Sequence, residues 1–175
     1  MLSTVIAGPG HGYDVGARME DRFGGVVRSS HRHAHEHLRA LEGQGLVEAV
    51  APDAVREFAP SRSGRATGNV FRATRRGVEA WRDWLTGPLD ETRATVDVLV
   101  RLRAVRPGDL ATMRAILDAF ETCVTCAAGH QPLLDADAAL PDLLGADLTG
   151  AILDAQRAWI RDVRARLHDY EAQAG

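Results

Sequence analysis

Glycine and proline residues divide the first 45 residues of this chain into three short segments. The breaks lie at residues 8–10, 24–25 and 43–45, and these residue types interrupt helices. Between the breaks, apolar residues recur at helical spacing, and in the third segment Ala34 and Leu38 share one face. We therefore predict three short helices, at residues 2–7, 13–23 and 31–45.

Two strand-like stretches follow these helices. Residues 46–50 and 69–73 flank a polar stretch rich in Arg, Ser, Gly and Pro, which is the pattern of a β-hairpin. Thr74 then caps a helix over residues 75–85, and Gly87-Pro88 ends it. Three helices followed by a hairpin and a fourth helix are typical of a winged helix-turn-helix domain.

The second half of the chain alternates helical segments with breaks. The pattern predicts helices at residues 90–103, 107–130 and 149–173, with a connection rich in Asp and Leu over residues 131–148. The last helix carries an apolar stripe that includes Ile152 and Trp159, and such a stripe requires a partner helix. We predict a mainly α protein with an N-terminal winged helix-turn-helix domain (residues 1–87) bearing a short β-hairpin wing, and a C-terminal antiparallel helical dimerisation domain (residues 88–175).

The composition indicates an ordinary globular protein, with 45% hydrophobic and 26% charged residues. No apolar stretch is long enough to cross a membrane, and the opening residues lack the pattern of a secretory signal. The two cysteines, Cys123 and Cys126, cannot form the multi-bridge framework of a small secreted domain. We therefore expect a cytoplasmic protein with no membrane partner.

The charge is unevenly distributed along the chain. The formal net charge is −3, and all 21 basic residues are arginine. Residues 56–82 are rich in arginine, whereas residues 135–147 hold four aspartates and no basic residue. A local basic patch is sufficient for a DNA-binding surface on an acidic protein.

Four ordered pieces of the sequence resemble the PadR-like family of transcriptional regulators. Val5–Val15 (VIAGPGHGYDV) is similar to the family's junction between its first two helices, and Leu38–Val47 (LRALEGQGLV) to the end of its recognition helix. Val70–Leu89 (VFRATRRGVEAWRDWLTGPL) is similar to the return strand, the Thr-x-x-Gly turn and the next helix. The tail AWIRDVRARL resembles the long closing helix.

The resemblance implies a dimer whose closing helices pack together, and a double-stranded DNA operator as partner. It also implies a hydrophobic cavity near the dimer interface for an aromatic or drug-like effector. The predicted function is therefore a dimeric DNA-binding regulator, a repressor released by a small aromatic or apolar ligand. No cofactor is expected.

The predicted DNA contacts lie on the third helix and the wing. The helix face opposite Ala34 and Leu38 would meet the major groove, and the wing would bind backbone phosphate or the minor groove. The alternatives are a solvated helix face and a solvated loop. The candidate residues are Ser30, Arg32, His33, Glu36, Arg39, Arg56, Arg62 and Arg65.

Histidines and cysteines suggest a second alternative, a metal- or pH-responsive regulator. His31 and His35 form one i,i+4 pair, and His33 and His37 form another on a nearly opposite face. A firm metal site needs further ligands, which the spacing does not identify. Cys123, Cys126 and His130 also share one helix face, although such cysteines are more often packed as small hydrophobic residues.

Three tryptophans are candidates for the effector cavity, since an indole offers a stacking surface. They are Trp81, Trp84 and Trp159, and each is otherwise expected in the core. A further alternative is a PadR-like scaffold that has lost DNA binding and binds or transforms a small molecule in its dimer cavity. Glu36, which is unfavourable near phosphate, and the histidines motivate it.

No catalytic set is apparent in the sequence. There is no phosphate-binding loop, serine elbow or carboxylate pair, and His11 has neither a nucleophile nor a paired acid beside it. We expect Gly12 to support a tight turn and Tyr13 to pack between helices. An enzymatic activity is therefore not expected.

Overall fold

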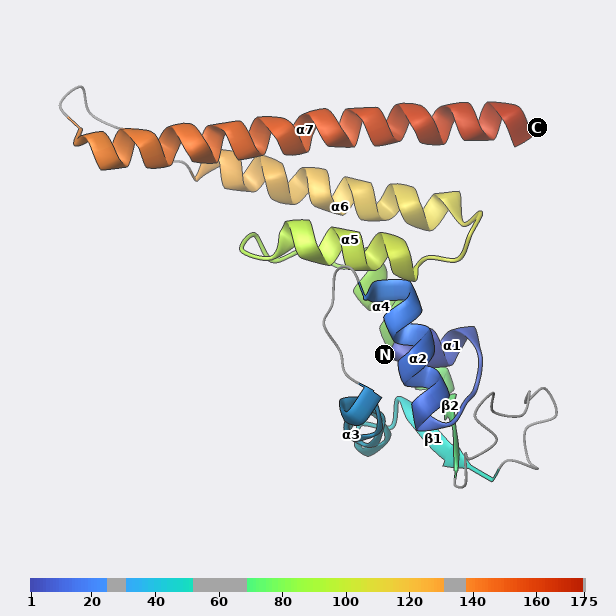
Figure 1. Ribbon diagram of the computed structural model, residues 1–175. Helices are drawn as coiled ribbons and strands as arrows, with labels where there is room; N and C mark the ends of the chain where they lie inside the picture. The colour runs from blue at the N-terminus through green and yellow to red at the C-terminus, as the bar shows by residue number, and fades with distance from the viewer. Residues whose placement is uncertain (25–30, 52–68, 131–137, 175) are drawn as a thin grey trace. The chain divides into compact units, whose positions relative to one another are not determined.

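The computed structural model describes residues 1–24, 31–51, 69–130 and 138–174 (Figure 1). By its internal contacts the chain divides into two compact units, Met1–Leu85 and Thr86–Gly175. Each unit has its own helices and its own buried residues, so the two are described separately.

The first unit has the element order of a winged helix-turn-helix domain. Its elements are α1 (Leu2–Ala7), α2 (Gly12–Phe23), α3 (His31–Gly43), β1 (Val47–Val50), β2 (Val70–Ala73) and α4 (Arg75–Thr86). The predicted helices and hairpin are therefore confirmed.

The hairpin is antiparallel, with Val47 opposite Ala73 and Val50 opposite Val70. The loop between α1 and α2 joins it, because Gly10 and Phe71 exchange backbone hydrogen bonds of 3.2 and 3.0 Å. The core of the unit lies between this hairpin and the helices, and it contains Val5, Val15, Leu38, Val47 and Phe71. The first piece of the family resemblance therefore contributes directly to the sheet and to the core.

The Thr-x-x-Gly turn connects β2 to α4. The Thr74 hydroxyl accepts a 3.0 Å hydrogen bond from the Gly77 amide, as predicted for a cap, and donates a 2.8 Å hydrogen bond to the Gly45 carbonyl. A Cβ atom on Gly77 would lie 1.9 Å from the Leu46 carbonyl oxygen. Only glycine fits there, because the start of α4 touches the backbone that enters β1.

The second unit contains the antiparallel helices α5 (Ala94–Ala104), α6 (Leu110–Gly129) and α7 (Leu140–Ala174) (Figure 1). Arg114 near the start of α6 pairs with Glu171 near the end of α7, and Arg164 pairs with Asp118. The packed faces bury mainly large apolar side chains, which include Val98, Ile116, Leu117, Phe120 and Ile160.

The start of α7 differs from the prediction. Residues 140–148 were expected in a connection, but α7 already begins at Leu140 and is 35 residues long. Pro141 is compatible with this start, because proline is tolerated in the first turn of a helix. Pro141, Gly145 and the aspartates of this stretch favour a loop locally, whereas Leu140, Leu144 and Leu148 recur every four residues and favour a helix.

Arg101 fixes the connection that follows α4. Its side chain is 3% exposed. The guanidinium donates hydrogen bonds to the carbonyl oxygens of Gly87 and Pro88, the latter at 3.0 Å. The first residues of the second unit are thus held against α5.

In the described part of the chain, every helix is too short or too polar to cross a membrane.

Candidate nucleic-acid interface and ligand pocket

Helix α3 separates an apolar face from a polar one. Ala34 and Leu38 are fully buried, and Leu38 belongs to the core beside Phe71. The side chains of His33, Glu36 and Arg39 are exposed. The polar face therefore combines an imidazole, a carboxylate and a guanidinium.

Arg39 is held by two local contacts. Its Nη1 atom donates a 2.7 Å hydrogen bond to Glu42, one turn later, and its guanidinium lies 5.9 Å from the centre of the Phe71 ring. The Arg39 side chain is 55% exposed. Such an exposed ion pair contributes less than about 1 kcal/mol, so a phosphate or a base can replace Glu42 as the partner.

The described histidines of α3 have different surroundings. His33, His35 and His37 are all exposed, and the His35 ring also meets the Phe71 ring edge to face, with ring centres 5.7 Å apart. Among the described residues, no group of three or more His, Cys, Asp or Glu side chains is arranged to hold a metal ion. The side chain of His31 lies outside the described residues, so its pairing with His35 stays a prediction.

Several predicted DNA contacts also lie outside the described residues. These are Ser30, the side chain of Arg32, and the wing residues Arg56, Arg62 and Arg65. Their roles stay predictions.

Tyr13 does not pack between helices as expected, since it is 58% exposed. Helical geometry explains the difference: residues two positions apart lie about 200° apart around a helix, and Val15 is the residue of α2 that points into the core. His11 is buried instead, at 7% exposure.

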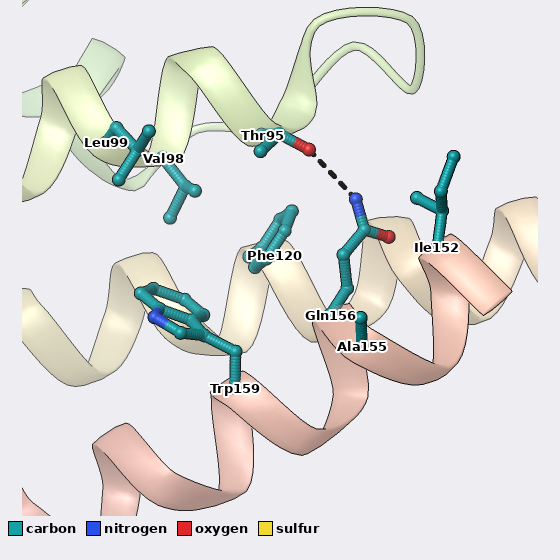
Figure 2. Close-up of a pocket in the computed structure, with 8 residues that line it drawn as sticks. All are labelled: Thr95, Val98, Leu99, Phe120, Ile152, Ala155, Gln156 and Trp159. Carbon is teal, nitrogen blue, oxygen red and sulfur yellow. Dashed lines mark hydrogen bonds between the residues drawn. The ribbon is translucent and has the colours of Figure 1, made fainter. Parts of the chain in front are cut away.

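An apolar pocket of about 310 Å³ lies among α5, α6 and α7 (Figure 2). All three helices contribute to its wall, and the side chains point into a common space. The lining residues are Thr95, Val98, Leu99, Phe120, Ile152, Ala155, Gln156 and Trp159.

The pocket has an aromatic wall and a neutral polar edge. The rings of Phe120 and Trp159 meet edge to face, with centres 5.9 Å apart and an angle of 79° between their planes. At the edge, the Gln156 side-chain amide donates a 2.8 Å hydrogen bond to the Thr95 hydroxyl (Figure 2). Both α5 and α7 run antiparallel to α6 and therefore parallel to each other (Figure 1), and this packing brings the two residues together although 61 positions separate them.

Trp159 lines this pocket, while Trp81 and Trp84 lie in α4, in the other unit. Trp84 is 40% exposed, and the indole N–H of Trp81 is buried with no acceptor among the described residues. The residues that α5 contributes to the pocket were not predicted, because no local pattern in the sequence shows which face of α5 meets Trp159. The feature of the sequence that indicated a pocket was Trp159, a large aromatic residue within the apolar stripe of α7.

The two cysteines of α6 have different exposure, since Cys123 is buried and Cys126 is exposed. Burial raises the pKa of the Cys123 thiol, and the Glu91 carboxylate raises it further. The Nδ1 atom of His130 lies 3.5 Å from a Glu91 carboxylate oxygen. These groups are neighbours, but the structure does not arrange them as metal ligands.

No family model matches the sequence, and no curated protein matches it either. Two solved structures are similar to the chain. The PadR protein of Bacillus subtilis, solved in complex with operator DNA, is 14% identical, with 95% of this chain and 93% of that chain covered and a TM-score of 0.39. A PadR-like transcriptional regulator from Bacillus cereus is 17% identical, with 98% and 96% covered and a TM-score of 0.38. The chain is thus similar to PadR-like regulators along nearly all of its length.

Proposed function

We propose that this protein is a DNA-binding transcriptional regulator of the PadR-like kind, and that the exposed face of α3 enters the major groove. The observation that carries the proposal is the placement of α3. Its Ala34 and Leu38 face packs into a core that contains the Phe71 strand, while its opposite face is open to solvent. A recognition helix of a winged helix-turn-helix domain needs this placement.

The open face of α3 carries groups that recognise bases and phosphates. The Arg39 guanidinium can bond to guanine O6 and N7 or to a phosphate, and the Glu36 carboxylate can accept from the cytosine amino group. The His33 imidazole adds a further hydrogen-bonding group to this face. Because the formal net charge is −3, DNA affinity must come from this face and from the predicted wing arginines rather than from the overall charge.

The active species in this proposal is a homodimer formed through α7. This helix has 35 residues and its antiparallel neighbour α6 has 20, so α6 can cover only part of it. Leu140, Leu144 and Leu148 are 60 to 67% exposed and form one i,i+4 ridge, which suits packing against the same ridge of a second copy. A two-fold dimer would present two α3 helices to an operator with two half-sites.

The regulatory part of the proposal is a repressor that leaves its operator when a small aromatic or apolar ligand binds. The pocket beside Trp159 supports it, because its volume falls at the lower end of the range of about 300–1,000 Å³ found for ligand sites. Helix α7 lines the pocket and, in this proposal, also forms the dimer interface. A ligand that shifts α7 can therefore change the spacing of the two DNA-binding units in the dimer.

Fluorescence anisotropy with labelled DNA from the upstream region of the protein's own gene tests the role of α3. We expect Arg39→Ala to weaken binding by about 5- to 150-fold if Arg39 contacts a base, which corresponds to about 1–3 kcal/mol. Arg157→Ala is the matched control, since Arg157 also pairs with an acid in an i,i+3 arrangement, Asp154, but in the other unit. Equal affinities for both variants, with unchanged thermal melting, would contradict the assignment of α3.

A further inference from the structure

We propose that the pocket binds an uncharged aromatic compound that carries a hydrogen-bond donor, that Gln156 is its polar partner, and that aromatic acids are excluded. This inference rests on the proposed function as a ligand-responsive regulator and names the chemical class of the ligand. It follows from the chemistry of the pocket wall.

Among the described residues, none that lines the pocket carries a charge. Val98, Leu99 and Ile152 provide aliphatic surface, and Phe120 and Trp159 provide aromatic surface (Figure 2). A carboxylate or sulfonate placed against this wall would lose water without gaining a cation. Arg157, the nearest basic residue along α7, is not among the residues that line the pocket.

The polar edge of the pocket selects for a donor. The Gln156 amide nitrogen is bonded to the Thr95 hydroxyl, and among the described residues no other hydrogen bond of Gln156 is found. Its amide oxygen can therefore accept from a ligand. A phenol hydroxyl or an aromatic N–H satisfies this acceptor while the rings remain against Trp159.

The aromatic wall limits the shape of the ligand. Phe120 presents its ring nearly perpendicular to Trp159, so a flat ring system can lie along the indole with its edge toward Phe120. The volume of about 310 Å³ is enough for a compound of two or three rings and too small for a large drug.

Two fluorescent probes with the same ring skeleton test the charge requirement. N-phenyl-1-naphthylamine is neutral, and 8-anilino-1-naphthalenesulfonate adds a sulfonate to the same rings and the same N–H. We expect the full-length protein to bind the neutral probe about tenfold more tightly or better, because only the sulfonate must be desolvated without a partner. Equal affinity for the two probes, or tighter binding of the sulfonate, would overturn the proposal.

Variants assign the binding to this pocket. Gln156→Arg supplies the missing cation and should reverse the preference in favour of the sulfonate probe, whereas Gln173→Arg places the same change near the end of α7, outside the pocket, and should leave the preference unchanged. Ala155→Phe fills the pocket from an exposed position and should weaken binding of the neutral probe about tenfold or more. Circular dichroism verifies that each variant is folded.

The outcomes separate this inference from the proposed function, since DNA binding is measured on the same preparation without a probe. Intact DNA binding together with no probe binding would overturn the proposed ligand class and leave the proposed function standing. A second copy of the chain that fills the pocket would give this result. Binding that is unaffected by Gln156→Arg and by Ala155→Phe would show that the probe lies elsewhere on the protein.

Discussion

The thiols of Cys123 and Cys126 are three residues apart on α6 and are expected to react very differently. Burial raises the pKa of Cys123, and only the thiolate reacts, so Cys123 stays protonated and shielded at neutral pH. Cys126 is exposed. We expect one fast and one slow thiol with Ellman's reagent; Cys126→Ser should remove the fast phase and Cys123→Ser should retain it. Two thiols that react at the same rate in the native protein would be inconsistent with this packing.

Asp109 caps α6 and makes its stability depend on pH. The carboxylate accepts hydrogen bonds from the amide and the hydroxyl of Thr112, at 3.1 and 2.7 Å, and these bonds lower the pKa of Asp109. A lowered folded-state pKa means that the contribution is fully present above the ordinary value of about 3.9 and disappears as the pH falls through the lowered value.

The test is urea unfolding of Asp109→Ala and Asp109→Asn. At pH 7 we expect the alanine variant to lose about 1 kcal/mol of unfolding free energy, and the asparagine variant to lose much less because it can still accept from Thr112. The difference between wild type and Asp109→Ala should shrink below pH 4. A difference that stays constant down to pH 2.5 would exclude the carboxylate as its source.

At the scale of single elements, the junction of β1, β2 and α4 depends on Gly77. A Cβ atom at this position would lie 1.9 Å from the Leu46 carbonyl oxygen, which is backbone and cannot rotate away. We expect Gly77→Ala to destabilise the protein by about 1–3 kcal/mol or more, because the start of α4 must move. Thermal and urea unfolding measure the change.

Gly150→Ala is the control for this glycine. Gly150 lies within α7 and a Cβ atom there would meet no heavy atom within 4 Å. Alanine is a better helix former than glycine by about 1 kcal/mol, so this variant should be slightly more stable than wild type. If both alanine variants change the free energy of unfolding in the same direction and by the same amount, the close contact between position 77 and the Leu46 carbonyl does not cause the loss of stability in Gly77→Ala.

The elements of the first unit could be predicted because glycine, proline and threonine mark their ends. Thr74 and Gly77 show this best. Thr74 provides the hydroxyl that caps α4, and Gly77 lacks the Cβ atom that would collide with the Leu46 carbonyl oxygen. The start of α7 could not be predicted, because the leucines at its beginning are interspersed with aspartates, Pro141 and Gly145, which locally indicate a loop. Tyr13 was misplaced because a family motif does not state which side of α2 faces the core.

The pocket was only partly predictable for a related reason. Trp159 is prominent in an apolar stripe, so the sequence alone suggests it. Thr95 and Gln156 meet only when α5 and α7 pack side by side in the same direction (Figure 1), and nothing near either residue indicates the other. A site built from three helices is a property of their packing.

At the scale of the whole molecule, the exposed leucine ridge of α7 determines the oligomeric state in our account. We expect the wild-type protein to be a dimer by light scattering after size exclusion, and Leu144→Glu to shift it toward monomer, because a carboxylate in the centre of an apolar interface must be desolvated. Tyr170→Glu is the control, since Tyr170 is 57% exposed on the same helix but lies outside the ridge. A dimer that tolerates Leu144→Glu would place the interface elsewhere.

In the proposed function, the first unit binds DNA specifically. This is best tested by anisotropy of the wild-type protein with a duplex from the upstream region of its own gene and with a scrambled duplex, at about 50 and 200 mM salt. We expect tighter binding to the upstream duplex by about 10³-fold or more, with affinity for both duplexes falling as salt rises. Equally weak binding to the two duplexes at both salt concentrations would contradict it, and the function would then have to be sought in the pocket beside Trp159.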